Sequence, residues 1–224
     1  MNTSLSDDSA LDPERTLALS YAPAARRAAL AALFALDDAL AQLMRTTSQP
    51  AVAQLRLAWW RDALAALDHA PAPAQPVLRG LEADLLPLGV RGGALVPIVH
   101  GWEVLVEEDR LDPEALRRFA EGRGLVFEIA GAVMGGRGEP LAAAGQGWAL
   151  ADLANHLSTA QEAEQARALA RPLLVAATTA RWGRPVRALG ALAHLAGRDL
   201  SRGPEAVASP QRVGRMLWHR LTGR

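Results

Sequence analysis

Residues 21–64 constrain the fold most, because they contain two amphipathic helical patterns joined by the short connection RTTSQP. In the first pattern, residues 23–46, apolar side chains recur at steps of three and four residues, the spacing of one helix face. In the second, residues 50–69, Leu57, Trp60 and Leu64 form a similar stripe. Pro50 suits the first turn of this helix, where a missing N–H loses no hydrogen bond. The segment therefore predicts a pair of consecutive helices.

The remainder of the chain continues the helical pattern. Half of all residues are apolar, and Ala and Leu dominate while Val, Ile, Thr, Tyr and Phe are sparse, a balance that favours helix over strand. Pro, Gly and capping residues divide the sequence, and a kink is predicted at Pro172. The expected helices cover residues 12–20, 23–46, 50–69, 76–86, 94–108, 112–134, 141–159, 160–181, 185–196 and 210–221. We predict an all-α, single-domain helical bundle over residues 12–224, preceded by a flexible tail over residues 1–11.

Composition excludes several chemistries. The 24 basic residues are all Arg and are balanced by 24 acidic residues, so a large basic field and nucleic-acid binding are not expected. The lack of Lys excludes Schiff-base catalysis and a phosphate-loop lysine. The lack of Cys excludes thiolate nucleophiles, disulfides and zinc–thiolate sites.

The terminal and apolar segments predict a location. The acidic start MNTSLSDDSALDPE does not have the positive start and apolar run of a signal peptide. No apolar run reaches the length of a bilayer without a charge or a Pro, so no transmembrane segment is expected. These features predict a cytoplasmic protein, for which peripheral contact with a membrane stays open.

The segment RTTSQPAVAQLRLAWWRDAL, residues 45–64, resembles the opening helix pair of the squalene/phytoene synthase family. The resemblance extends over residues 15–195 and implies the isoprenoid synthase fold of these head-to-head prenyl transferases. It further implies carboxylates on two facing helices that hold Mg²⁺ and the diphosphate of an isoprenyl substrate, beside an apolar tunnel for the chains.

The first aspartate motif can be placed in two registers. Read directly, DDALA is one carboxylate short, and Asp37 and Asp38 would be Mg²⁺ ligands. The preceding residues LFAL instead resemble the residues before the family's Cys-Arg pair. In that register Asp37 and Asp38 align with the Cys-Arg pair. The metal positions then fall on Ala41, Gln42 and Arg45, which supply no carboxylate. Neither register completes the site, and the two aspartates could equally be solvated or ion-paired.

The second motif falls on GWALADLANHLSTA, residues 147–160, where Asp152 is the one acidic residue. Leu157 and Ser158 stand where the family has Arg and Asp. Asp152 and His156 are four residues apart, so they share a helix face and form a candidate ligand-binding pair. In an active enzyme Asp152 would join Asp37 and Asp38 as a metal ligand. The alternative is an Asp–Arg pair with a partly buried histidine.

Further candidates lie on the first helix pair. Arg45, Arg56 and Arg61 are candidate anion ligands, because guanidinium groups suit phosphate oxygens, and the alternative is ion pairing. Trp60 fits the buried stripe, whereas the adjacent Trp59 would line a cavity, cap the RTTSQP loop or contact a partner.

The small residues of RRFAEGRGLVFEIAGAVMGG, residues 117–136, resemble the helix beside the family's substrate tunnel. Gly122 and Gly124 leave room either for an isoprenoid chain or for a neighbouring helix.

Three functions follow from these motifs. The leading hypothesis is a pseudoenzyme, a non-catalytic isoprenoid-binding or assembly factor, because carboxylates of the metal site are missing. The resemblance also implies a precedent, since the family includes a non-catalytic branch linked to assembly of mitochondrial complex I. Its partners would be an isoprenoid, an isoprenyl diphosphate or a protein, and no cofactor is expected. The first alternative is an active prenyl transferase with an altered Mg²⁺ site at Asp37, Asp38 and Asp152. The second alternative is a plain helical module for protein interaction.

Overall fold

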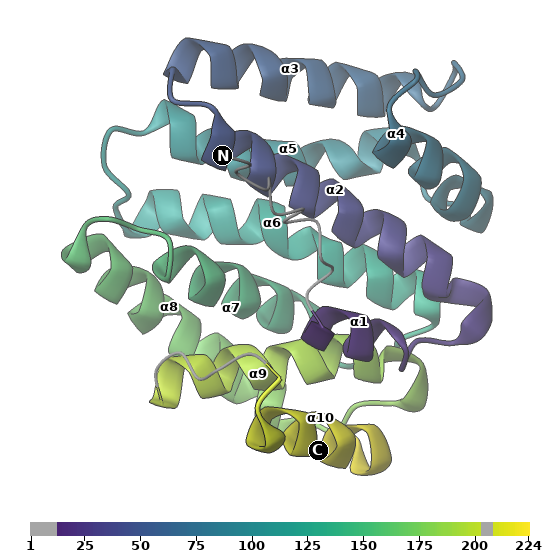
Figure 1. The fold of residues 1–224 in the computed structure, drawn as a ribbon, viewed down its shortest axis with the longest axis vertical. Helices are drawn as coiled ribbons and strands as arrows, with labels where there is room; N and C mark the ends of the chain where they lie inside the picture. The colour runs from purple at the N-terminus through teal and green to yellow at the C-terminus, as the bar shows by residue number, and fades with distance from the viewer. Residues whose placement is uncertain (1–12, 203–207) are drawn as a thin grey trace, which may run out of the picture.

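The computed structural model describes residues 13–202 and 208–224, and in these ranges the chain forms helices and no strand (Figure 1). The helices are α1 Pro13–Leu19, α2 Arg27–Thr46, α3 Pro50–Ala66, α4 Pro76–Gly80, α5 Val96–Glu107, α6 Pro113–Met134, α7 Leu141–Ala154, α8 Ala160–Thr179, α9 Arg187–Arg202 and α10 Pro210–Thr222. The predicted all-α bundle is confirmed, while the predicted tail over residues 1–11 lies outside the described residues. No helix within the described ranges combines the length and apolarity needed to cross a bilayer.

Local signals set most helix ends. The Asp112 carboxylate accepts hydrogen bonds from the N–H groups of Glu114 and Ala115 at 2.9 and 2.8 Å and so caps α6. Gly135, with φ 82°, ends the same helix in the left-handed region. The structure differs from expectation at α7, which ends at Ala154 rather than residue 159. Because α7 and α8 pack against each other, the chain needs a turn over residues 155–159 to reverse direction.

The helices stack in layers around α6 and α7 (Figure 1). In this view α3 lies at the top, α2, α5 and α6 follow below it, and α10 lies at the bottom beyond α9. Helix α6 packs against α5 on one side and α7 on the other, and α7 also contacts α8 and α9. The centre of the molecule is therefore enclosed by α2, α5, α6 and α7.

Glycine pairs allow α5, α6 and α7 to approach closely. A Cβ on Gly122 would lie 2.5 Å from the Cα of Gly101, and a Cβ on Gly145 would lie 2.3 Å from the carbonyl oxygen of Gly124. No side chain fits at these distances, so the glycines are required by helix contact. The space beside Gly122 and Gly124 is thus taken up by neighbouring helices, and Gly122 also borders an open groove of about 630 Å³ along α5 and α6.

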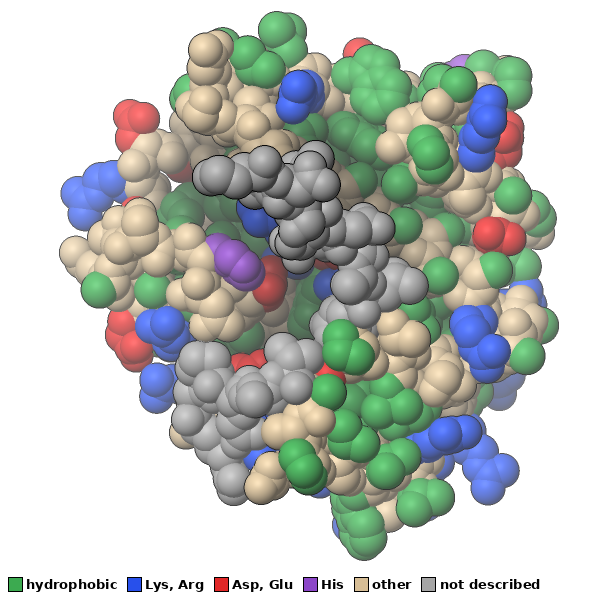
Figure 2. Space-filling model, in the orientation of Figure 1, with side chains coloured by type: hydrophobic (Ala, Val, Ile, Leu, Met, Phe, Trp, Pro, Cys, Tyr) green, Lys and Arg blue, Asp and Glu red, His purple; other side chains and the backbone are tan. Residues whose placement is uncertain are grey.

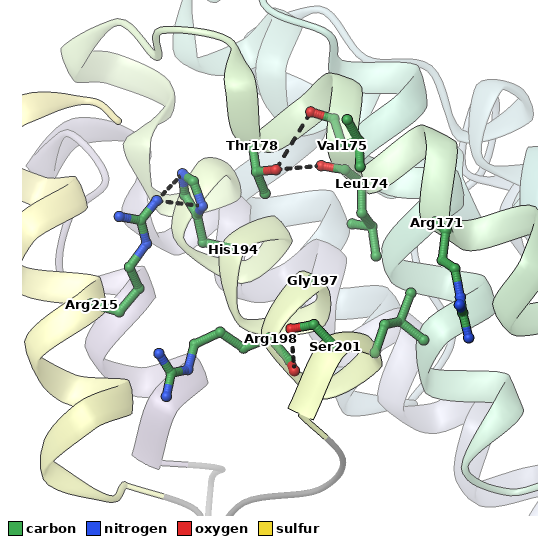
Figure 3. Close-up of a pocket in the computed structure, with 10 residues that line it drawn as sticks. Arg171, Leu174, Val175, Thr178, His194, Gly197, Arg198, Ser201 and Arg215 are labelled. Atoms are coloured by element: carbon green, nitrogen blue, oxygen red, sulfur yellow. Dashed lines mark hydrogen bonds between the residues drawn. The ribbon is translucent and has the colours of Figure 1, made fainter.

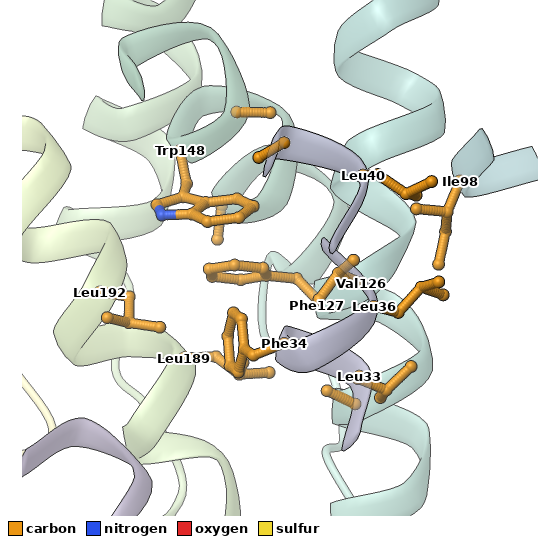
Figure 4. Packing of buried hydrophobic residues seen from close by; sticks show 14 of the residues in the cluster. Leu33, Phe34, Leu36, Leu40, Ile98, Val126, Phe127, Trp148, Leu189 and Leu192 are labelled. Carbon is orange, nitrogen blue, oxygen red and sulfur yellow. The ribbon is translucent and has the colours of Figure 1, made fainter. Parts of the chain in front are cut away.

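An aromatic cluster forms the core between α2, α6 and α7 (Figure 4). The ring of Phe34 lies 6.4 Å from that of Phe127 and 6.1 Å from that of Trp148, and Phe127 and Trp148 lie 5.2 Å apart. Such edge-on and tilted contacts stabilise a core beyond simple burial. The cluster fixes one face of Trp148 in place, directly beside the polar centre described next.

Candidate functional site

Two aspartates on different helices meet at one buried cation, Arg123 of α6. The Nε and Nη2 groups of Arg123 donate to the two carboxylate oxygens of Asp37 on α2, each at 2.9 Å. Its Nη1 group donates to Oδ2 of Asp152 on α7 at 2.5 Å. The side chain of Arg123 is 3% exposed and that of Asp37 is 0% exposed. The guanidinium therefore joins α2 and α7 through α6 in a buried three-residue ion pair, which we call the Arg123 centre.

Two tryptophans form aromatic walls for this cation. The guanidinium carbon of Arg123 lies 4.6 Å from the ring centre of Trp102 on α5 and 4.4 Å from that of Trp148 on α7. At these distances a cation is attracted to the indole face, most strongly where water is excluded. The walls also hold the planar guanidinium in one orientation, so that its donors point at Asp37 and Asp152.

The charges of the Arg123 centre stabilise one another. Burial alone would lower the pKa of Arg123, but Asp37 and Asp152 raise it above its usual value. Burial likewise raises the pKa of Asp152, and the stronger combined effect of Arg123 holds that pKa below its usual value. At neutral pH the guanidinium is therefore charged and Asp152 is ionised, as a buried charge requires a partner.

A cavity of about 360 Å³ opens beside the Arg123 centre. Its walls are mostly apolar side chains from α2, α5, α7 and the adjoining loops, with a few polar groups among them. The lining residues are Ala41, Met44, Arg45, Trp102, Leu105, Leu111, Arg123, Asp152, Leu153, His156 and Leu157. Figure 2 shows a hollow on this face of the molecule, with a histidine and acidic side chains at its edge. Apolar walls with few polar groups are typical of small-ligand sites.

Three of the residues predicted from the sequence come together in this cavity, namely Arg45, Asp152 and His156. The guanidinium of Arg45 donates to Oε1 of Gln42 at 2.9 and 3.2 Å, which holds it one turn away on α2. Nδ1 of His156 lies 3.9 Å from Oδ1 of Asp152 and 2.8 Å from its backbone oxygen. The cavity thus has a cation and a histidine near its polar end.

Asp38 and Trp59 lie elsewhere. Asp38 forms an ion pair with Arg15 of α1, whereas its sequence neighbour Asp37 pairs with Arg123. Trp59 is 46% exposed and packs edge-on against the buried Trp60, with ring centres 5.3 Å apart. Neither residue lines the cavity.

Arg56 and Arg61 are also separate from the cavity. Arg56 donates to Oγ1 of Thr47 at 3.1 Å, at the connection between α2 and α3. Arg61 donates to Oε1 of Glu103 on α5 at 3.0 Å. Both guanidinium groups are used in contacts between neighbouring elements, so they do not join Arg45 in one anion site.

Sequence reasoning missed Arg123, the residue that organises the site. A signal was present, because Arg123 lies four residues after Phe119 and four before Phe127, on the apolar stripe of α6. Both phenylalanines are fully buried. A charge on such a stripe must find a buried partner of opposite charge. The partner could not be read from the sequence, because Asp37 is 86 positions away.

The residues do not fit the Mg²⁺ site that the resemblance implies. Both oxygens of Asp37 and one oxygen of Asp152 already accept hydrogen bonds from Arg123. Mg²⁺ requires oxygen ligands, and a guanidinium beside them would repel it. Residues 13–202 and 208–224 contain no group of three or more His, Cys, Asp or Glu side chains that could hold a metal ion.

Comparison with known proteins places the chain in a family. The sequence model of squalene/phytoene synthase matches residues 10–126, just over half of the 224-residue chain. The match includes Asp37 and ends in α6 just after Arg123, so α7 with Asp152 lies beyond it. No curated protein and no solved structure matches the chain. The family match agrees with the helical fold, and the chain belongs to the squalene/phytoene synthase family.

Proposed function

We propose that this chain is a cytoplasmic, non-catalytic member of its family that binds one isoprenoid molecule in the cavity beside the Arg123 centre. The family binds isoprenyl diphosphates, so an isoprenoid is the class of ligand that we propose. The observation that carries the proposal is that Arg123 donates hydrogen bonds to both Asp37 and Asp152. These two are the acidic residues, one from each motif region, that lie close together.

The guanidinium cannot replace the chemistry of Mg²⁺. A divalent ion offers open coordination positions to the diphosphate oxygens and neutralises the charge of the leaving group. The three nitrogens of Arg123 all donate to carboxylates, and the group carries a single charge. Recruiting a metal to Asp37 would require breaking two buried, charge-assisted hydrogen bonds. Ionisation of a prenyl diphosphate at this place therefore has no support from the side chains.

The cavity itself suits an apolar chain. Its volume of about 360 Å³ is near the lower end of the range of about 300–1,000 Å³ for small-ligand sites. A head-to-head condensation has to hold two isoprenoid chains at once, and this cavity favours one. The head of that one chain would lie near Arg45 and His156.

An assembly role is the second candidate, and a surface feature favours it. Leu55 and Trp59 of α3 are 72% and 46% exposed and lie four residues apart, on one face of the helix. Exposed apolar pairs of this kind are typical of protein contacts. Cross-linking from a photoreactive residue at position 59 should capture a protein partner, and Leu55→Ser should reduce that capture.

The proposal is tested by measuring diphosphate release and isoprenoid binding separately, and only binding should be observed. Purified protein incubated with farnesyl or geranylgeranyl diphosphate and Mg²⁺ should release no diphosphate. The same protein should bind radiolabelled farnesol without added metal. Ala41→Phe, which fills the cavity, should abolish that binding, whereas the matched surface variant Asp38→Asn should retain it.

The rival reading, an active prenyl transferase, has an equally clear outcome. Diphosphate release that requires Mg²⁺ and disappears in Asp152→Ala would overturn the proposal. Farnesol binding that is unchanged by Ala41→Phe would also contradict it, because the ligand would then lie elsewhere.

A further inference from the structure

The last described helix, α10, has a buried face and an exposed apolar face. Met216 and His219 are buried and face the interior, where α10 packs on α9. On the opposite side Leu217, Trp218 and Leu221 are 44%, 57% and 77% exposed. Their spacing of three and four residues places them together on one face, which we call the outer face of α10. Large apolar side chains gathered on an exposed face indicate a contact with something outside the chain.

Charge is strongly segregated along the sequence, although the total is zero. Residues 165–224 contain eleven Arg and two acidic residues, a formal charge of +9, whereas residues 1–164 contain thirteen Arg and 22 acidic residues, a formal charge of −9. The net charge of zero therefore conceals an arginine-rich last quarter of the sequence. The outer face of α10 lies within that basic part.

A cluster of arginines adjoins the end of the outer face. Nη1 of Arg187 donates to the backbone oxygens of Arg220 at 2.5 Å and Leu221 at 3.3 Å. Burial and repulsion by Arg184 and Arg181 lower the pKa of Arg187, as expected for neighbouring cations. Among the described residues, no Asp or Glu forms an ion pair with these arginines or with Arg220. The lower edge of Figure 2 shows the result, with hydrophobic side chains over α10 and basic side chains beside them.

A second group of cations lies on the other side of α10. A groove of about 630 Å³ between α8, α9 and α10 is lined by Arg171, Arg198 and Arg215 together with apolar side chains (Figure 3). Burial lowers the pKa of His194 in this groove to about 3, so at neutral pH it is uncharged and accepts a hydrogen bond from Arg215 at 2.8 Å. Arg171 is paired with Glu164 at 3.3 Å, so Arg215 is the basic side chain that α10 itself contributes on this side.

We propose that the outer face of α10 binds the surface of a bilayer that contains anionic lipids. Leu217, Trp218 and Leu221 would enter the headgroup region, and the flanking arginines would contact lipid phosphates. Exposed Trp and Leu bordered by Arg are the composition of helices that lie in a membrane interface. A second copy of the chain fits less well, because the arginine clusters beside the two copies of this face would repel each other. Nucleic acid would attract the arginines but gives the leucines no apolar environment.

Vesicle co-sedimentation tests this proposal independently of the cavity ligand. The full chain should bind vesicles of equal parts phosphatidylcholine and phosphatidylglycerol, bind phosphatidylcholine vesicles far more weakly, and lose affinity as salt rises. Trp218→Ser/Leu221→Ser should weaken binding by at least about tenfold. Removing Arg181 or Arg184 should weaken it about fivefold each. The matched variant Leu55→Ser/Trp59→Ser, which removes an exposed apolar pair from α3, should bind as the parent chain does.

Four results would overturn the proposal. They are absence of binding to the anionic vesicles, equal binding by the Trp218→Ser/Leu221→Ser variant, a dimer that this variant dissociates in sedimentation velocity, and binding to an oligonucleotide in place of vesicles. Circular dichroism checks that each variant is folded. If the serine variant fails to fold, the Arg181→Gln/Arg184→Gln variant decides the question, because both side chains are exposed.

Discussion

The chain places a buried arginine between two carboxylates twice, and the two centres differ in their surroundings. In the second centre, Arg212 of α10 donates through Nε and Nη2 to the two oxygens of Glu14 on α1, at 2.6 and 2.7 Å, and also contacts Asp199 on α9. This Arg212 centre joins three helices at the lower edge of the molecule. Arg123 joins α2, α6 and α7 in the same manner.

The two centres differ in the side chains that pack against the guanidinium and in the cavity beside it. Arg123 packs against two indole rings and borders an apolar cavity of about 360 Å³. The cavity beside Arg212 is smaller, about 140 Å³, and charged side chains such as Glu14, Arg15 and Asp199 line it, together with Asp152 and Trp148 of the Arg123 centre. An Arg–dicarboxylate centre can therefore serve helix packing alone. What distinguishes the Arg123 centre is the apolar cavity beside it, so ligand binding rather than metal chemistry should set it apart.

The largest effect is expected when Arg123 is removed. Arg123→Met leaves Asp37 buried without a partner, and the free energy of unfolding should fall by about 3–5 kcal/mol. Urea unfolding measures this change. The double variant Arg123→Met/Asp37→Asn should recover part of the loss, because the uncompensated charge is gone. If Arg123→Met alone is as stable as the parent chain, the Arg123 centre is not a buried ion pair.

A smaller loss is expected at the second centre. Arg212→Met should lower the free energy of unfolding by about 1–3 kcal/mol, the range for lost hydrogen bonds to charged groups. Glu14 is buried but keeps the hydrogen bond from the N–H of Ala208 at 2.9 Å, and Asp199 is partly exposed and can be solvated after the change. A loss equal to that of Arg123→Met in the same urea experiment would remove the proposed difference between the two centres.

As pH falls, the first loss of stability should come from the two buried histidines of α9 and α10, His194 and His219. Burial, reinforced by repulsion from Arg215, lowers the pKa of His194 to about 3 and that of His219 to about 4, from 6.5. The unfolded chain therefore binds more protons, so stability is complete above pH 6.5 and is lost as pH falls towards these values. The melting temperature should decrease through this window, and His194→Gln should flatten the decrease. An unchanged slope in that variant would rule out His194 as its source.

Stability at lower pH involves both centres. The pKa of Asp152 and that of Glu14 are held below their usual values, because Arg123 and Arg212 together with hydrogen bonds outweigh the effect of burial. Protonating these carboxylates adds a second loss of stability below pH 4.5, the ordinary value for Glu.

The smallest effect is expected at Asp38, the neighbour of Asp37. Its ion pair with Arg15 is partly exposed, and such pairs contribute less than about 1 kcal/mol. Asp38→Asn should therefore leave the unfolding midpoint in urea nearly unchanged. A loss as large as that of Arg123→Met would show that the two adjacent aspartates have equivalent roles.

Local signals predicted the helices well, because capping and proline effects depend on neighbouring residues. Pro50 and Asp112 mark the start of α3 and α6 in both the sequence and the structure. Trp60 was correctly placed on the buried stripe and Trp59 outside it, because consecutive side chains on a helix point about a quarter-turn apart. These features require no knowledge of the tertiary structure.

The candidate site was harder to predict, because its contacts join distant parts of the chain. The partners of Arg123 lie 86 and 29 positions away, and the choice of Asp37 over Asp38 depends on which side of α2 faces α6. The arginines 45, 56 and 61 looked like one group in sequence but point to different neighbours. Likewise, a net charge of zero concealed the basic surface around α10.

A crystal structure obtained with Mg²⁺ and a non-hydrolysable farnesyl diphosphate analogue would show directly whether Asp37 and Asp152 bind a metal ion or Arg123. We expect Arg123 still to donate to Asp37 and Asp152, with no metal ion on either carboxylate. Mg²⁺ ions bound to Asp37 and Asp152 and bridged to the diphosphate, with Arg123 displaced, would contradict this expectation.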